Sequence, residues 1–317
     1  MSTVLITGAA TGIGNLTARA LARTGHRVYA SMRAPGARNA ARAAELRRLA
    51  AAERLDLHVV ELDVASQESA DRAVAEVLDD AGALDVVIHN AGHLVTGYVE
   101  AFTAEEIAKL IDVNTLGVQR LNRAALPHLR GQGRGTLLYV GSTIPVTTPP
   151  FLGPYVVSKA AMDSLALVTS YEVAPLGIET VIVMPGAFTQ GTDHFPSAGR
   201  PADATGVGAG YRTLDPLVAR NEQATESLFA PGTQADPAVV AEEIARILSL
   251  PFGERPFRSV VDLTRSMVEQ ANSAVFDARS DFVRRMGFEE VLHVAHTPHE
   301  VRDRPRITSP SSPQISI

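Results

Sequence analysis

The chain has 317 residues, 45% of them hydrophobic and 20% charged, which is the composition of a globular protein with one large domain or at most two. The net charge is −6. Because the chain has no cysteine, a disulfide framework, a thiolate metal site and a cysteine nucleophile are excluded, and we expect no metal. No basic block interrupts the acidic balance, which argues against nucleic acid and favours a small-molecule partner. Without a signal peptide or a membrane-spanning run, a cytoplasmic protein is expected.

Short apolar, β-branched runs alternate with helical patterns over roughly the first 260 residues, which predicts βαβ units and a parallel sheet. Continuous runs such as Val86–Ile88 are typical of strands buried on both faces. Seven strands are expected near 3–7, 27–31, 57–61, 85–89, 134–141, 178–184 and 258–262. Helices are expected near 12–24, 39–53, 66–80, 103–112, 114–130, 153–174 and 237–250. The prediction is a single-domain, doubly wound α/β fold of Rossmann type, with helices on both faces of the sheet.

Three later stretches depart from this alternation within a catalytic domain predicted at 1–263. Residues 187–235 are rich in Gly, Pro, Ser and Asp, and a loop of that length predicts a lid over the substrate. An apolar helical pattern resumes over 264–294, which predicts a helical extension packed on the same domain. Residues 295–317 contain four prolines and are expected to form a flexible tail.

A glycine-rich loop follows the first predicted strand, in the run Thr7-Gly8-Ala9-Ala10-Thr11-Gly12-Ile13-Gly14. Glycines permit a tight turn and a close approach to a pyrophosphate, whose charge is stabilised by the following helix N-terminus. We therefore expect Gly8, Thr11, Gly12, Ile13 and Gly14 to bind a dinucleotide. An ordinary strand-to-helix turn is the alternative, and the βαβ context favours the binding site.

The end of the second predicted strand bears on the choice between NAD(H) and NADP(H). An Asp or Glu there would accept the ribose hydroxyls of NAD, but the run Arg27-Val-Tyr-Ala-Ser-Met-Arg33 contains neither. Arg33 could bind a 2′-phosphate, and Thr11 could donate its hydroxyl from the neighbouring loop. We therefore favour NADP(H) over NAD(H), although Arg33 could also be a solvated surface charge.

Tyr155 and Lys159 lie four residues apart near the start of a predicted helix, on one helical face. A free tyrosine titrates near ~10, so an adjacent ammonium that stabilises the phenolate would make Tyr155 an acid/base near neutral pH. Only Lys109 and Lys159 are lysines, while the other 27 basic residues are arginines. Lysine retained at 159 fits a role for a compact ammonium, although a Y-x-x-x-K pair alone is common on surfaces.

Other polar residues follow predicted strands at the carboxyl edge of the sheet, where open α/β folds bind ligands. Ser142 follows the fifth strand, and its hydroxyl could donate to a substrate carbonyl; a turn cap is the alternative. The run Asn90-Ala91-Gly92 follows the fourth strand. Asn114 opens the next long predicted helix, where a simple N-cap is the alternative.

Taken in order, these motifs resemble the short-chain dehydrogenase/reductase family in its compact single-domain form. The resemblance rests on the glycine loop, Asn90-Ala91-Gly92, Asn114, Ser142, Tyr155-x-x-x-Lys159 and Pro185-Gly186. The run Val-Tyr-Ala-Ser-Met-Arg and the longer C-terminal part are similar to the branch that holds estradiol 17β-dehydrogenases and retinol dehydrogenases. Two departures are His89, where the family often has a second Asn, and Gly141, where a second Ser is common.

The resemblance implies a role for each matching residue. Tyr155 would be the general acid or base, Lys159 would lower its pKa and hold the nicotinamide ribose, and Ser142 would polarise the carbonyl. Asn114 would hold a water that links Lys159 to solvent. The remaining cofactor contacts implied are Asp63 and Val64 at the adenine, Asn90, Ala91 and Gly92 along the cofactor, and Pro185, Gly186 and Thr189 at the nicotinamide. By analogy, a homodimer or homotetramer is expected.

The function expected is NADP(H)-dependent interconversion of a secondary alcohol and a ketone, or of an alcohol and an aldehyde, on a lipophilic small molecule. Apolar residues expected to line the site are Leu94, Val95, Ile144, Val146, Pro149, Phe151, Phe188, Phe195 and Phe229, several of which could instead pack the lid on the sheet. An NADP(H)-binding sensor without turnover is the alternative from another class, and a lost Tyr or Lys would be its mark. A dehydratase or epimerase is a second alternative, and the absence of an enlarged sugar-nucleotide domain argues against it.

Overall fold

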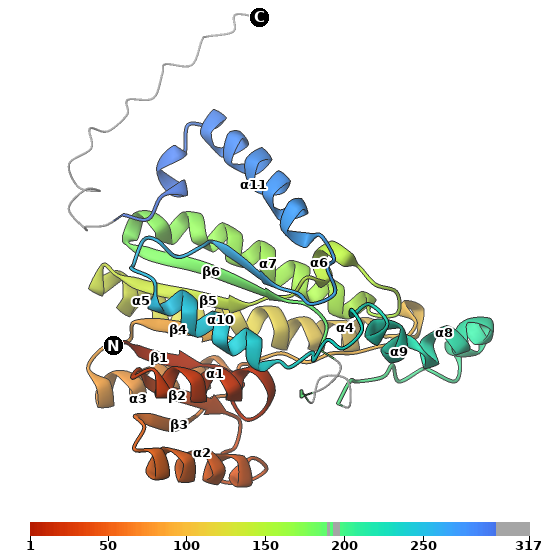
Figure 1. The fold of residues 1–317 in the computed structure, drawn as a ribbon, viewed down its shortest axis with the longest axis horizontal. Helices are drawn as coiled ribbons and strands as arrows, with labels where there is room; N and C mark the ends of the chain where they lie inside the picture. The colour runs from red at the N-terminus through yellow and green to blue at the C-terminus, as the bar shows by residue number, and fades with distance from the viewer. Residues whose placement is uncertain (189–190, 193–196, 296–317) are drawn as a thin grey trace, which may run out of the picture.

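A computed structural model of the chain describes residues 1–188, 191–192 and 197–295. In these residues seven parallel strands form one sheet in the order β3-β2-β1-β4-β5-β6-β7, which confirms the predicted fold class (Figure 1). The strands are β1 (Thr3–Ile6), β2 (Arg27–Met32), β3 (Leu57–Glu61), β4 (Val86–His89), β5 (Gly135–Val140), β6 (Ile178–Pro185) and β7 (Arg258–Val261). The order reverses between β1 and β4, and this switch point creates the crevice in which such sheets bind ligands.

Two helical layers cover the sheet, because alternate residues of each strand face opposite sides. In β1, for example, Val4 and Ile6 pack beneath α1 (Gly12–Arg23), α2 (Ala40–Glu53) and α10 (Ala238–Ser249). Leu5 packs on the other side, beneath α3 (Gln67–Ala81), α5 (Gly117–Gln132) and α7 (Gly153–Val173). The carboxyl ends of all seven strands therefore meet at one edge, where the loops that carry the predicted site residues emerge.

The two helices predicted at 103–112 and 114–130 are one continuous rod, which is a correction to the sequence analysis. α4 (Ala104–Ile111) passes into α5 through a π-helical segment, η2 (Asp112–Leu116), so Asn114 lies inside the rod and is not a helix N-cap. π-Helical turns are rare and costly, and they persist where tertiary contacts hold them. The contacts of Asn114 described below are of that kind.

The described part of the region after β6 contains helices where the sequence predicts a loop at 187–235. It contains η4 (Val207–Leu214), α8 (Asp215–Ala219) and α9 (Asn221–Glu226), which project beyond the sheet at the right of Figure 1. After β7, α11 (Val268–Arg285) lies within the predicted extension at 264–294, and its first residue Val268 is buried in the core. The short helices are η1 (Val99–Ala101), α6 (Ile144–Thr147), η3 (Ala174–Leu176) and η5 (Glu289–Leu292). The tail predicted at 295–317 lies, beyond Ala295, outside the described residues.

No helix in the described part of the chain combines the length and the apolar character needed to cross a membrane.

Candidate active site

The glycine loop lies directly against the end of β4. A Cβ at Gly8, where φ is +68°, would lie 2.8 Å from the Cα of Ala91, and a Cβ at Gly14 would collide with the amide of Asn90. Both positions therefore require glycine. The two predicted cofactor loops, one after β1 and one after β4, form a single backbone wall.

Hydrogen bonds connect these two loops. The hydroxyl of Thr7, a residue absent from the predicted site, accepts from the backbone N–H groups of Asn90 at 2.9 Å and Ala91 at 3.0 Å. The Asn90 side chain donates in return to the carbonyl oxygens of Thr7 at 2.9 Å and Gly8 at 3.1 Å. The Asn90 side-chain NH2 and its backbone N–H are thus committed to holding the loop, so any cofactor contact at this residue falls to its oxygen atoms.

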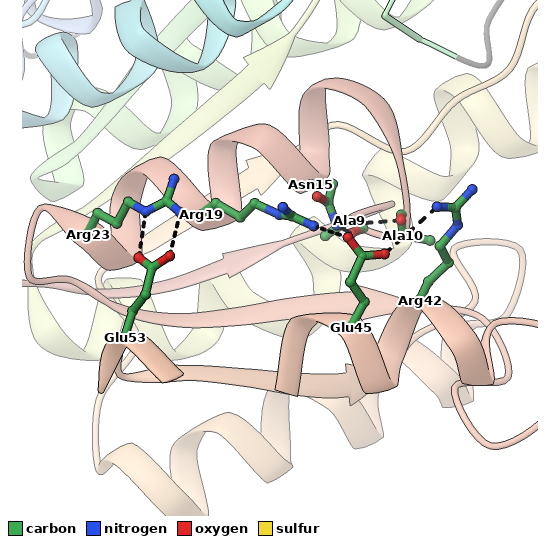
Figure 2. Close-up of polar contacts among 8 residues, drawn as sticks. All are labelled: Ala9, Ala10, Asn15, Arg19, Arg23, Arg42, Glu45 and Glu53. Carbon is green, nitrogen blue, oxygen red and sulfur yellow. Dashed lines mark hydrogen bonds and ion pairs between the residues drawn. The ribbon is translucent and has the colours of Figure 1, made fainter. Parts of the chain in front are cut away.

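Ion pairs placed one after the other along the two helices hold α1 beside α2 (Figure 2). Arg19 reaches Glu45 at 2.6 Å, and Arg23 binds Glu53 through two bonds of 2.7 and 2.8 Å. At the start of α1, the Asn15 amide donates to the carbonyl oxygen of Ala9 at 3.1 Å, within the loop itself (Figure 2). These contacts fix the loop on its helix.

The residues of this loop fit an anionic dinucleotide. Gly12 has a φ of +55°, and a Cβ added there would meet nothing closer than Thr192 at 3.9 Å, so the turn is open on its outer side. Thr11 is the N-cap of α1 but its hydroxyl makes no capping bond, which leaves it and the first-turn N–H groups for a ligand. Ile13 packs against the core beneath this turn.

Arg33 directly follows β2 and is exposed, with no ion pair to any described residue. The pKa of His93 is lowered, mainly by partial burial and to a smaller extent by the positive charge of Arg33. The two side chains therefore lie on the same crevice. Asp63 accepts from the N–H of Ala65 at 3.0 Å, and Val64 packs beneath Gly117 of α5. Arg33, His93, Asp63 and Val64 thus place two basic groups, one carboxylate and one apolar group where the adenosine half of a dinucleotide would lie.

Asn114 is buried in the π-helical segment and uses both ends of its amide. Its Oδ1 accepts from the N–H of His93 at 3.0 Å, and its Nδ2 donates to the carbonyl oxygen of His93 and to the Ser158 hydroxyl, each at 3.0 Å. Ser158 in turn donates to the carbonyl oxygen of Tyr155 at 2.9 Å. Asn114 therefore ties the loop after β4 to the helix that carries Tyr155 and Lys159.

Lys159 is 7% exposed, and its Nζ donates to the carbonyl oxygen of Val140 at 3.0 Å. A Cβ at Gly92 would lie 3.2 Å from Asn114 Oδ1 and 3.9 Å from Lys159 Nζ, so all three residues meet at one point. Burial lowers the pKa of Lys159 to about 8. Burial raises the pKa of Tyr155, and the lowering expected from the Lys159 ammonium stays a prediction.

Ser142 lies at the end of β5 and is half-buried. Its hydroxyl oxygen accepts from the N–H of Ile144 at 3.2 Å, which is the turn cap that the sequence left as an alternative. An oxygen that accepts one bond still carries its own proton, so Ser142 can cap the turn and donate to a ligand at once.

Pro185 and Gly186 end β6 beside this turn. The carbonyl oxygen of Pro185 accepts from the N–H of Thr143 at 3.0 Å, and the N–H of Gly186 donates to Val261 at 2.9 Å. A Cβ at Gly186 would collide with the Asp262 carboxylate. Thr189, the third residue expected at the nicotinamide, lies outside the described residues.

His89, the departure from the family pattern, is fully buried beside the site. Its ring stacks on Tyr139 with centroids 4.7 Å apart, and the Asn122 amide donates to the Tyr139 hydroxyl at 3.2 Å. Burial lowers the pKa of His89 to about 3. The imidazole therefore stays neutral and supports the ends of β4 and β5 by packing.

The apolar residues expected at the substrate divide into groups. Leu94, Ile144 and Tyr155 form one buried cluster with Leu110 and Leu152, against which Val95 and Ala198 pack. Phe188 instead packs in the core beneath α1 and α10. Val146 is 41% exposed, while Pro149, Phe151 and Phe229 are half-buried. Phe195 lies outside the described residues.

The segment after β6 is tied to the loop after β4 by contacts absent from the predicted site. Gly199 exchanges backbone bonds of 2.9 Å with Leu94 and Thr96. Tyr98 stacks on Tyr211 with centroids 4.7 Å apart and donates to Asp215 at 2.7 Å. This segment therefore packs against the loop after β4.

Comparison with known proteins agrees with this geometry. One family profile, described as short chain dehydrogenase, matches residues 2–200. A 3-ketodihydrosphingosine reductase of Bacteroides thetaiotaomicron is 32% identical over 192 residues, 60% of this chain and 66% of that protein. Human 17-beta-hydroxysteroid dehydrogenase type 1 is 32% identical over 186 residues, 58% of this chain and 56% of that protein. The matched stretch thus spans about half to two thirds of these relatives.

Solved structures share the fold over most of the chain. A short-chain dehydrogenase from Streptomyces avermitilis is 28% identical and has a TM-score of 0.66, over 90% of this chain and 97% of that one. An alcohol dehydrogenase from Thermococcus sibiricus, solved with 5-hydroxy-NADP, is 26% identical with a TM-score of 0.64, over 82% and 96% of the two chains. The expected resemblance is confirmed.

Replacing Lys159 with Met should change how stability depends on pH. Below pH 8 both native and unfolded chains carry the ammonium, and its burial costs free energy; from pH 8 to 10.5 the native state holds fewer protons than the unfolded state. The free energy of unfolding of the wild type, relative to Lys159→Met, should therefore rise by about 2 kcal/mol between pH 7 and 9.5. Urea unfolding of the cofactor-free protein at several pH values measures this.

The other lysine provides a matched control. Lys109 is exposed on α4, so the Lys109→Met difference should stay flat over the same range. A flat difference for Lys159→Met as well would contradict the buried-ammonium assignment.

Proposed function

Because the chain belongs to the short chain dehydrogenase family, we propose that it is an NADP(H)-dependent oxidoreductase that interconverts a secondary alcohol and a ketone, or an alcohol and an aldehyde. The substrate proposed is a lipophilic small molecule. The observation that carries the proposal is that the buried side chains of Asn114 and Lys159 meet beside Gly92, and that Asn114 joins the loop after β4 to the helix carrying Tyr155.

In this proposal the chain's residues hold the reactants and move one proton. Tyr155 gives a proton to the carbonyl oxygen in reduction and takes it back in oxidation, while Ser142 donates a hydrogen bond to the same oxygen. The Lys159 ammonium has one bond to a described acceptor, the Val140 carbonyl, so its other donors are available for ribose hydroxyls and for stabilising a phenolate. A bound nicotinamide supplies or accepts the hydride at its C4.

NADP(H) is proposed over NAD(H) because Arg33 stands unpaired at the end of β2, where no carboxylate is present to repel a phosphate. Among similar structures, the Thermococcus enzyme was solved with 5-hydroxy-NADP and a Burkholderia cenocepacia gluconate 5-dehydrogenase with NADP. A 3-ketoacyl reductase from Brucella melitensis, 22% identical, was solved with NADH, and that likeness concerns the fold alone.

A lipophilic substrate is proposed because the cluster around Tyr155 is apolar and Ala198, in the segment after β6, packs against it. The names of two relatives, a ketodihydrosphingosine reductase and a hydroxysteroid dehydrogenase, agree with such a substrate. The same segment is proposed as the lid.

The chain is also proposed to form a homo-oligomer, which the exposed side chains of Val157 and Val168 on α7 support. A cytoplasmic location is proposed as well.

Tyr155→Phe should leave NADPH binding intact and lower the rate of ketone reduction by about 10²- to 10⁴-fold, because the proton donor is removed. NADPH absorbance, followed with a panel of aliphatic, aromatic and steroidal ketones, measures the rate. Tyr171→Phe removes a hydroxyl from the far end of the same helix and should have no such effect. Wild-type rates in Tyr155→Phe would refute the role. Tight NADPH binding by the wild type with no turnover on any ketone would favour a sensor instead.

Arg33→Ala should weaken NADPH binding by about 10- to 100-fold, because a charge-assisted bond to the 2′-phosphate is lost. NADH lacks that phosphate, so its dissociation constant should change less than about threefold. Fluorescence titration of both nucleotides gives the two ratios. An equal loss of affinity for NADPH and NADH, or no loss for either, would show that Arg33 does not bind the 2′-phosphate.

A further inference from the structure

Charge is distributed unevenly along the chain, contrary to the expectation from its overall balance. Residues 15–54 contain nine arginines and two glutamates, a net charge of +7, so the rest of the chain carries −13. These residues form α1, β2 and α2, the layer beside the glycine loop. One side of the cofactor crevice is therefore strongly basic in an acidic protein.

The two glutamates are already committed to ion pairs. Glu45 binds Arg19 and Glu53 binds Arg23, as Figure 2 shows, and both glutamates have lowered pKa values, first through hydrogen bonds from these arginines. The remaining arginines in and around α2 form what we name the arginine cluster: Arg33, Arg38, Arg42, Arg47, Arg48 and Arg54. All six are exposed. Arg42 approaches Glu45 at 3.9 Å, and the other five have no ion pair within the described part of the chain.

The cluster begins at the crevice. Arg33 directly follows β2 at the carboxyl edge of the sheet, and α2 runs back from that edge. Arg38 and Arg42 therefore lie near the crevice, and Arg54 lies at the opposite end of α2. The pairing of Arg19 with Glu45 and of Arg23 with Glu53 sets α1 parallel to α2. In that register Arg42 is level with the first turn of α1, where Asn15 holds the glycine loop (Figure 2).

We propose that the arginine cluster is an electrostatic capture surface for the phosphorylated adenosine end of NADP(H). Unpaired like charges on one face create a potential that attracts an anion and raises its association rate, without requiring a contact from each arginine. The acidic remainder of the chain repels the same anion elsewhere, so the cofactor is directed to the crevice. Arg33 binds at the end of this path, and the other five act from a distance. The inference rests on the proposed NADP(H) dependence.

The arrangement favours a dinucleotide over a larger polyanion. The cluster leads to the glycine loop, where unpaired backbone N–H groups end the path, and its outermost members Arg48 and Arg54 lie on one short helix. A nucleic-acid or membrane surface needs a broad basic face, but outside residues 15–54 the chain has a net charge of −13.

The test is the rate of NADPH association, measured by stopped-flow fluorescence at about 10 mM and about 300 mM salt. At the lower salt the screening length is about 30 Å, so distant charges act on the approaching cofactor. The double variant Arg48→Gln/Arg54→Gln changes two exposed residues outside the binding site. The control Arg123→Gln/Arg130→Gln removes the same charge from exposed positions on α5.

At low salt the cluster variant should bind NADPH about three- to tenfold more slowly than the wild type, with an unchanged dissociation rate. The effect should shrink at high salt and be smaller for NADH, which carries less charge. The control variant should bind at the wild-type rate. Equal association rates for wild type and cluster variant at low salt would overturn the proposal, as would an equal loss in the control.

Failure of the proposed function would look different, because the wild type would then bind NADPH no more tightly than NADH at either salt concentration. Binding of a short duplex DNA or of anionic phosphatidylserine vesicles that competes with NADPH at 150 mM salt would also overturn the proposal, since the cluster would then serve a polyanion.

Discussion

Burial of a single ammonium constrains the whole site. Lys159 reaches the interior from α7, and one backbone carbonyl, at Val140, satisfies one of its three donors. Burying a charge with so few partners is costly, and the lowered pKa of about 8 expresses that cost. The fold tolerates it because the ammonium stands at the edge of the crevice, where ribose hydroxyls can complete its hydrogen bonds. Stability given up in the empty protein is thus recovered on binding.

The surrounding structure keeps that ammonium in place. Asn114 occupies a π-helical turn, which local propensity disfavours, and its amide binds the backbone of His93 on one side and Ser158 on the other. A Cβ at Gly92 would lie 3.2 Å from the Asn114 Oδ1, so a larger residue there would press on the Asn114 amide. The π-helical segment therefore contains the residue that joins the loop after β4 to α7.

The parts of the site set by local sequence could be predicted. The glycine loop follows from turn chemistry, and the spacing of Tyr155 and Lys159 places both on one face of a helix whatever surrounds it. Alternation of apolar runs gave the strands to within a few residues. In these cases the signal lies within one or two turns of the residue concerned.

The rest depends on contacts between distant segments. From the sequence alone Asn114 is interpreted as a helix N-cap, because its partners His93 and Ser158 lie far from it along the chain. Phe188 lies within the segment predicted as the lid but belongs to the core cluster that contains residues of α1 and α10. Tyr98 and Tyr211 lie in separate loops, and the pairing of Arg19 with Glu45 requires two helices to be adjacent. The basic layer could be counted from the sequence, but its position beside the crevice required the fold.

Cofactor binding is expected to restore the charge of Lys159, because ribose hydroxyls complete the hydrogen bonds of its ammonium. Calorimetry of NADPH binding at pH 8, in buffers of different ionisation enthalpy, counts the protons taken up. With a pKa of about 8, the free wild type is half protonated at Lys159, so binding should take up about 0.3 to 0.5 proton, and Lys159→Met should take up none. Equal uptake by both proteins, or no uptake by the wild type, would contradict the account.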